Sequence, residues 1–146
     1  MFDVRVDGTK LVKLLKRFER ASGDLTPCMQ VIAEQLVSAV NEEFETEGQG
    51  RWPELADSTI KARRKGGRGA KILQDTGRLA ASIRANAGAD FAEASTDVSY
   101  AIFHVSSAPR RVIPLRNFFD VREGVVEEAA QTLLDWLKDA FKQAKP

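Results

Sequence analysis

The chain has 146 residues, of which 43% are hydrophobic and 29% are charged, and its formal net charge is +1. These values are typical of one globular domain, so they argue against intrinsic disorder and against a polycation that binds nucleic acid by bulk attraction. No apolar stretch approaches the roughly 20 residues of a membrane span, and the first ten residues do not resemble a secretory signal, so we expect a cytoplasmic protein without a membrane segment.

The first part of the chain predicts a strand and two helices. Residues 2–6 alternate apolar and polar side chains, which is the period of a half-buried strand. Residues 9–23 and 27–46 carry apolar side chains at helical spacing and predict two amphipathic helices, the second capped by Thr26. The expected buried stripe of the second helix consists of Met29, Ile32, Ala33, Leu36, Val37, Val40 and Phe44.

A short helix and a basic loop are expected next. Glycines end the long helix at about residue 48, and residues 57–65 predict a short helix that Asp57 or Ser58 caps. The glycine-rich segment that follows carries no large apolar side chain. We therefore expect a mobile basic loop at about 63–71.

The middle of the chain predicts a β-hairpin between two short helical or undecided segments. Residues 76–83 predict one or two helical turns. Residues 83–87 and 91–96 favour two antiparallel strands joined by a turn at Gly88. Residues 98–105 fit a strand or a helix, because a short apolar run does not settle the period.

The last part of the chain predicts a long helix, with Asp120 as its cap. Phe118 and Phe119 are adjacent, so in an extended chain they face opposite ways, and we expect one of them to be offered to a partner. The expected apolar set of the helix is Val126, Ala130, Leu133, Leu137 and Phe141, with Trp136 beside it.

These elements predict a single domain, residues 1–146, of the α+β class. A small antiparallel sheet packs in it against long N-terminal helices and a C-terminal helix. The sequence holds neither an internal repeat nor a linker long enough to separate two domains. Trp52 and Trp136 are expected in the core.

Charge is distributed unevenly along the chain. Residues 61–71 carry a local charge of +6, and residues 34–57 carry a local charge of −6. Two segments of opposite charge favour a head-to-tail contact between copies of the chain. Such a contact closes into a ring if the rotation between neighbours allows it. The basic segment alternatively contacts the phosphates of a nucleic acid. The candidate contact residues are Lys61, Arg63, Arg64, Lys65, Arg68, Lys71, Arg110, Arg111, Arg116 and Phe118.

The residues that catalysis needs are scarce. A hydrolase would have to use the single histidine, His104, with a nucleophile such as Ser99 and a carboxylate such as Asp97. The single cysteine, Cys28, is expected to be a packing residue. One cysteine and one histidine exclude an internal disulfide and a Cys/His zinc site within one chain. We expect no enzyme activity and no cofactor.

Three sequence blocks resemble the phage virion morphogenesis, or tail completion, proteins of Mu-like and P2-like phages. The blocks are GQGRWPELADSTIKARR, ILQDTGRLAASI and VSYAIFHVSSAPRRVIPLRNFF, and together they extend from Gly48 to Phe119. The family usually has a glycine shortly after the histidine of the third block, where this chain has Ser106-Ser107-Ala108. The residues that match the family pattern, which we expect to determine the fold, are Trp52, Leu55, Leu73, Thr76, Gly77, Leu79, Ser82, Tyr100, His104 and Pro114.

The resemblance implies a structural component of the virion that completes the tail or joins head to tail. It implies a ring of identical subunits, possibly six as in the related neck proteins of long-tailed siphophages. The partners would be copies of itself, the tail tube or the head–tail connector, with non-specific contact to phage DNA. The protein would be found in the host cytoplasm during assembly and then in the tail or neck. A small nucleic-acid-binding domain that uses residues 61–71 is the alternative.

Overall fold

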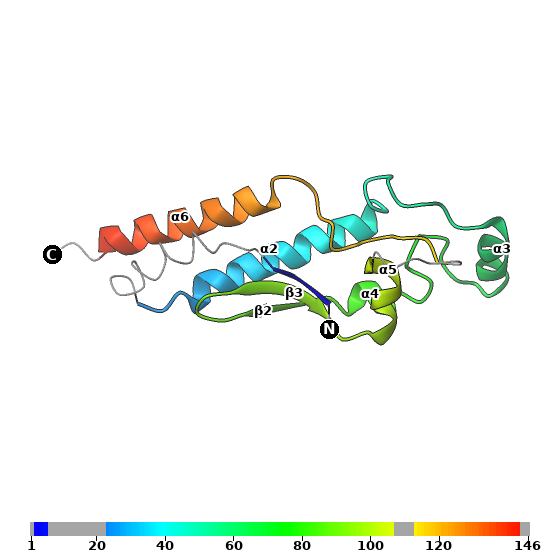
Figure 1. Cartoon of the computed structure of the whole chain (residues 1–146), viewed down its shortest axis with the longest axis horizontal. Coiled ribbons are helices and arrows are strands. Elements are labelled where there is room, and N and C mark those ends of the chain that lie inside the picture. The colour runs from blue at the N-terminus through cyan, green and yellow to red at the C-terminus, as the bar shows by residue number, and fades with distance from the viewer. Residues whose placement is uncertain (1, 6–22, 107–112, 144–146) are drawn as a thin grey trace.

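The computed structural model describes residues 2–5, 23–106 and 113–143. The fold is α+β, as expected, and elongated, with α3 at one end (Figure 1). The helix predicted over residues 9–23 lies outside the described residues. The elements in chain order are β1 (Phe2–Arg5), α2 (Thr26–Glu45), α3 (Asp57–Lys65), α4 (Arg78–Ala81), β2 (Arg84–Ala87), β3 (Ala92–Thr96), the 3-10 turn η1 (Ser99–Ala101), α5 (Ile102–Val105) and α6 (Val125–Gln143).

Helix α2 is the central element, because the sheet packs on one side of it and α6 packs on another (Figure 1). Its predicted stripe is confirmed, with Val37 half-buried and the other members buried. The predicted cap is wrong, since Thr26 is already the first helical residue. The Asp24 carboxylate accepts a hydrogen bond from the Thr26 backbone N–H instead, and its hydrogen bonds with Thr26 hold the pKa of Asp24 below its usual value.

The sheet has three antiparallel strands in the order β1-β3-β2. The hairpin of β2 and β3 was predicted, and its register pairs Arg84 with Ser95. Strand β3 is buried along its whole length, because it is the central strand and one face lies against α2. Its polar residue Ser95 is satisfied across the sheet, where it receives a hydrogen bond from the Asn86 side chain at 2.7 Å. The polar residue of the central strand therefore does not disturb the packing of the sheet on α2.

Helix α6 begins later and in a different register than predicted. It starts at Val125, so Asp120 does not cap it, and the Asp120 carboxylate instead lies 3.2 Å from Arg51. Val125 and Ala129 are buried in place of the predicted Val126 and Ala130. The expected members Leu133 and Leu137 are buried, Trp136 packs against the core, and the Phe141 side chain lies outside the described set.

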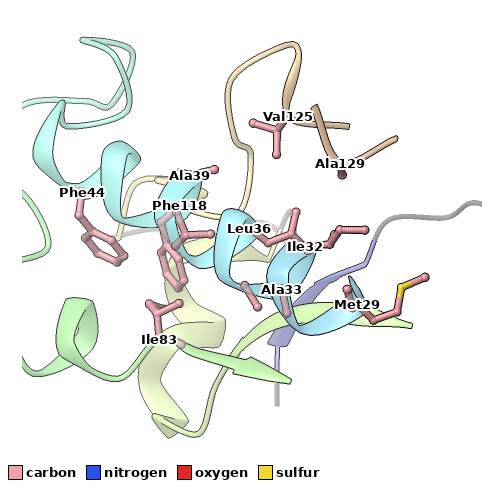
Figure 2. Packing of buried hydrophobic residues seen from close by; sticks show 14 of the residues in the cluster. Met29, Ile32, Ala33, Leu36, Ala39, Phe44, Ile83, Phe118, Val125 and Ala129 are labelled. Atoms are coloured by element: carbon pink, nitrogen blue, oxygen red, sulfur yellow. The ribbon is translucent and has the colours of Figure 1, made fainter. Parts of the chain in front are cut away.

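The two adjacent phenylalanines both turn toward the core, so the expectation that one of them faces a partner is wrong. Their backbone is a turn rather than an extended strand, which removes the alternation that the expectation required. Phe118 has no exposed surface, and its ring lies 5.1 Å from that of Phe44 and 4.6 Å from that of Phe119. Figure 2 shows the Phe44 and Phe118 rings side by side, with Ile83 next to Phe118.

Glycine is required where the chain leaves α2. Gly48 has a positive φ of 70°, and a Cβ at this position would collide with the indole ring of Trp52. Trp52 is buried there and meets Phe44 edge-on, with ring centroids 6.0 Å apart. The Gly-x-Gly-x-Trp sequence thus folds the chain back over the end of α2.

Candidate functional site

A cavity of about 380 Å³ lies among the short elements at one end of the molecule. We call it the motif cavity, because all its lining residues belong to the three sequence blocks that resemble the phage family. They come from the region around α3, from the loop before α4, and from η1, α5 and the segment after it. The lining residues are Leu55, Arg63, Leu73, Asp75, Thr76, Gly77, Arg78, Leu79, Tyr100, His104 and Arg116.

Arg116 forms part of the wall of the motif cavity and is only 6% exposed. Its guanidinium donates hydrogen bonds to the carbonyl oxygens of Pro53, at 2.7 and 2.9 Å, and of Glu54, at 3.0 Å. Burial lowers the pKa of Arg116, and the charge of Arg63 lowers it further. The side chain therefore ties the third sequence block to the first while keeping a buried positive charge that no carboxylate of the described residues neutralises.

A second set of polar contacts shapes the loop between α3 and α4. Asp75 lies 2.9 Å from the guanidinium of Arg68 and 3.5 Å from that of Arg63. Arg63 also donates to the carbonyl oxygen of Lys71 at 2.8 Å, and the Ile72 N–H donates to Glu47 at 2.7 Å. Residues 66–70 carry no large apolar side chain, as predicted, but Ile72 is buried in the core, and the contacts with Glu45 and Glu47 attach the loop to the end of α2.

The second sequence block places α4 against the cavity, which Arg78 and Leu79 line. Gly77 precedes α4 with a φ of 77°, which glycine adopts without strain. Leu79 is buried, and the Ser82 hydroxyl donates to the Leu79 carbonyl at 2.6 Å while lying 2.6 Å from the Thr96 hydroxyl. The Thr-Gly-x-Leu-x-x-Ser pattern thus joins a tight turn, a core residue and a link to β3.

The sequence left residues 98–105 open between strand and helix; residues 99–105 are helical and bring Tyr100 and His104 to the cavity. The His104 carbonyl accepts a hydrogen bond from the Arg116 N–H at 3.0 Å, which fixes the segment after residue 113 beside α5. Hydrophobic side chains remain exposed on these two segments. This surface, the α5 patch, consists of Tyr100, Ile102, Phe103, Ile113 and Leu115.

The predicted basic contact residues separate into three groups. Lys61, Arg64 and Lys65 are exposed on α3, and their side chains make no hydrogen bond or ion pair among the described residues. The side chains of Arg63, Arg68 and Lys71 make contacts within the chain. The Lys71 ammonium donates a hydrogen bond to the Glu45 carbonyl at 3.3 Å. Arg110 and Arg111 lie outside the described residues.

Two predicted contact residues are interior residues instead. Arg116 and Phe118 are buried, because the chain between α5 and α6 turns inward and crosses the loop after Trp52. Phe118 has no exposed surface to offer a partner, and Arg116 offers only the small part that lines the motif cavity. Among the matched positions, Trp52, Leu79 and Ser82 are buried, Leu55, Leu73, Gly77 and His104 are half-buried, and Thr76, Tyr100 and Pro114 are exposed.

Acidic residues of the block at 34–57 also form contacts within the chain. Glu43 is buried, and its carboxylate accepts hydrogen bonds from the side chains of Gln49, at 2.7 Å, and Arg51, at 3.2 Å. The Glu42 carboxylate forms an ion pair with the Arg122 guanidinium at 3.1 Å. Part of the charge that sequence alone assigns to a contact between copies therefore forms ion pairs within the single chain.

Chemistry-bearing groups do not gather into a metal site in the part of the chain that the structure describes: no three His, Cys, Asp or Glu side chains stand together there. Cys28 is a buried core residue, as expected, and burial raises the pKa of its thiol. No helix among the described segments is long and apolar enough to cross a membrane.

Sequence reasoning treated the matched positions as fold determinants and missed the cavity that they enclose. The signal was present in the ionisable residues Asp75, Arg78, His104 and Arg116, which stand between the apolar matches. Their convergence depends on how three irregular segments pack, which periodicity does not report.

Comparison with known proteins supports the resemblance. The model of the phage virion morphogenesis family matches residues 6–142, which include all three blocks. No curated protein and no solved structure matches the chain.

Proposed function

Because the chain belongs to the phage virion morphogenesis family, we propose that it is a structural subunit that completes the tail or joins head to tail, and that it catalyses no reaction. It works as a ring of identical copies, six by the resemblance, in contact with the tail tube or the head–tail connector. It is made in the host cytoplasm and ends in the tail or neck of the particle. The family match carries this proposal.

The exposed α5 patch supports a role in assembly. Phe103 is 53% exposed and Leu115 is 48% exposed, and each is next in sequence to a residue that lines the motif cavity, His104 or Arg116. Exposed clusters of large apolar side chains mark contacts with other proteins. Basic α3 lies at the same end of the molecule (Figure 1), so one end offers both an apolar and a charged surface.

An extract from infected cells that lack this protein tests the proposal. Added purified protein is expected to restore infectious particles, and electron microscopy is expected to place it at the head-proximal end of the tail. Sedimentation of the protein with its virion partners is expected to show a closed oligomer. Complete tails without the protein would contradict the proposal.

A second function, binding of DNA by the basic segment, is favoured by one observation: Lys61, Arg64 and Lys65 are exposed and uncommitted on α3. Replacement of these three with serine is expected to abolish DNA binding and to flatten its salt dependence. Unchanged binding of DNA would remove this candidate.

A further inference from the structure

The motif cavity has more positive charge than its own carboxylate neutralises. Asp75 is the one carboxylate in the lining, and it already pairs with Arg63 and Arg68. Arg78 and Arg116 also line the cavity, and neither has a carboxylate at ion-pair distance among the described residues. The carbonyl dipoles of Pro53 and Glu54 solvate the buried guanidinium of Arg116, but they leave its net positive charge in place. The cavity is therefore electrostatically prepared for an anionic group.

The surroundings of the cavity indicate what carries that anion. Leu55, Leu73 and Leu79 supply apolar lining, and the α5 patch continues the apolar surface outside the cavity through Tyr100. A protein segment presents carboxylates and large apolar side chains side by side, whereas duplex DNA presents phosphates flanked by sugars and keeps its bases stacked inside. A volume of about 380 Å³ accommodates a side chain rather than a folded element.

We propose that the motif cavity receives an aspartate or glutamate side chain from a segment of another virion protein, and that the apolar neighbours of this residue lie on the α5 patch. The carboxylate meets Arg78 at the entrance and the positive field of Arg116 from the wall. The inference rests on the proposed assembly function, to which it adds the chemistry of the partner segment. Arg116 holds the cavity wall in place through its hydrogen bonds and supplies positive charge, whereas Arg78 contacts the carboxylate directly.

Nuclear magnetic resonance titration of the full chain tests this inference with two acetylated, amidated tripeptides, Phe-Glu-Leu and Phe-Gln-Leu, and a short oligothymidylate. The glutamate peptide is expected to shift the signals of Leu79, Tyr100 and His104, and the glutamine peptide to leave them nearly unchanged. Equal shifts with both peptides, no shift with the glutamate peptide, or stronger binding of the oligothymidylate at these residues would each overturn the inference.

Two matched variants sharpen the titration. Arg78 is exposed, so Arg78→Gln is expected to leave the fold intact and to weaken binding of the glutamate peptide about fivefold. Arg64→Gln removes the same charge from α3 outside the cavity lining and is expected to change nothing. Equal effects of the two variants would contradict a defined carboxylate site.

The two proposals fail separately. A protein that completes tails in the extract but ignores the glutamate peptide would keep its assembly function and lose this inference. A protein that binds the peptide at the cavity but never restores particles would overturn the assembly function and leave only the preference of the cavity for carboxylates.

Discussion

Around α2 the chain buries apolar side chains between regular elements, whereas at the motif end, residues 48–82, 99–106 and 113–116, it ties short and irregular segments together with arginines and hydroxyls. The first region, α2 with α6 and the sheet, we call the core half. Its stability follows from the apolar area it buries. The motif end depends on a few directional bonds, which shape a cavity but give less room for substitution.

The largest loss of stability is expected in the hydrophobic core, where Phe118 packs against the end of α2. Phe118→Ala removes a fully buried ring that packs on Phe44 and Phe119, so we expect a loss of about 3–5 kcal/mol in the free energy of unfolding. Phe103→Ala makes the same change at an exposed site, where we expect about 0.5 kcal/mol or less. Urea unfolding monitored by circular dichroism measures both. Similar losses would mean that Phe118 is not part of the core.

At the motif end the largest effect is expected at Arg116. Arg116→Leu leaves the carbonyl oxygens of Pro53 and Glu54 without their donor, and we expect a loss of about 2–3 kcal/mol. Arg116→Lys keeps the charge but not the forked geometry, so it is expected to recover only part of the loss. Arg64→Leu serves as the exposed control on the same denaturation assay. Full recovery by lysine would show that charge alone matters.

A smaller effect is expected at the hydroxyl bridge between α4 and β3. Ser82→Ala removes the bond to the Leu79 carbonyl and the contact with Thr96, which should lower the free energy of unfolding by about 1 kcal/mol. Ser38→Ala lies on the exposed face of α2 and is expected to be neutral or slightly stabilising, because alanine favours helix. Hydrogen exchange should locate the Ser82 effect in residues 78–82. A uniform increase across the core half would contradict a local role.

The smallest effect is a pH dependence at the start of α6. Hydrogen bonds from Arg122 hold the pKa of Glu128 below its usual value, and Glu42 shares the same guanidinium. A depressed folded-state pKa gives stability that is present above the unfolded value, near 4.5, and is lost as the pH falls through the folded value. Urea midpoints of the parent protein and Glu128→Gln should therefore differ at pH 7 and converge in acid.

Glu127→Gln is the control for that measurement, since the Glu127 side chain is exposed and has no hydrogen-bond partner among the described residues. Its urea midpoint is expected to follow the parent protein across the whole range. A difference between the parent and Glu128→Gln that grows toward acid would contradict the assigned contact.

Sequence periodicity predicted the core half well. The strand at the start of the chain, α2 and the hairpin were all predicted close to their observed bounds, because amphipathic patterns report directly which face is buried. The predicted start of α6 was wrong: the helix begins at Val125, after Gly124, and the sequence does not say which of the adjacent residues Val125 and Val126 is buried.

At the motif end sequence predicted the elements but not their assembly. The glycine before α4 and the short helices follow from local turn and helix chemistry. The inward turn of Phe118, the burial of Arg116 and the cavity itself arise from contacts between segments about 60 residues apart, such as Arg116 with Pro53. No local pattern carries that information.

The most direct test of the account is whether the motif end, rather than the core half, makes the contacts of assembly. Phe103→Asp and Leu115→Asp alter exposed apolar residues of the α5 patch, and Leu134→Asp alters an exposed apolar residue of α6. In the extract that lacks the protein, folded Phe103→Asp and Leu115→Asp are expected to restore few infectious particles, and Leu134→Asp to restore them as the parent does. Normal restoration by both patch variants, or its loss with Leu134→Asp alone, would contradict the account.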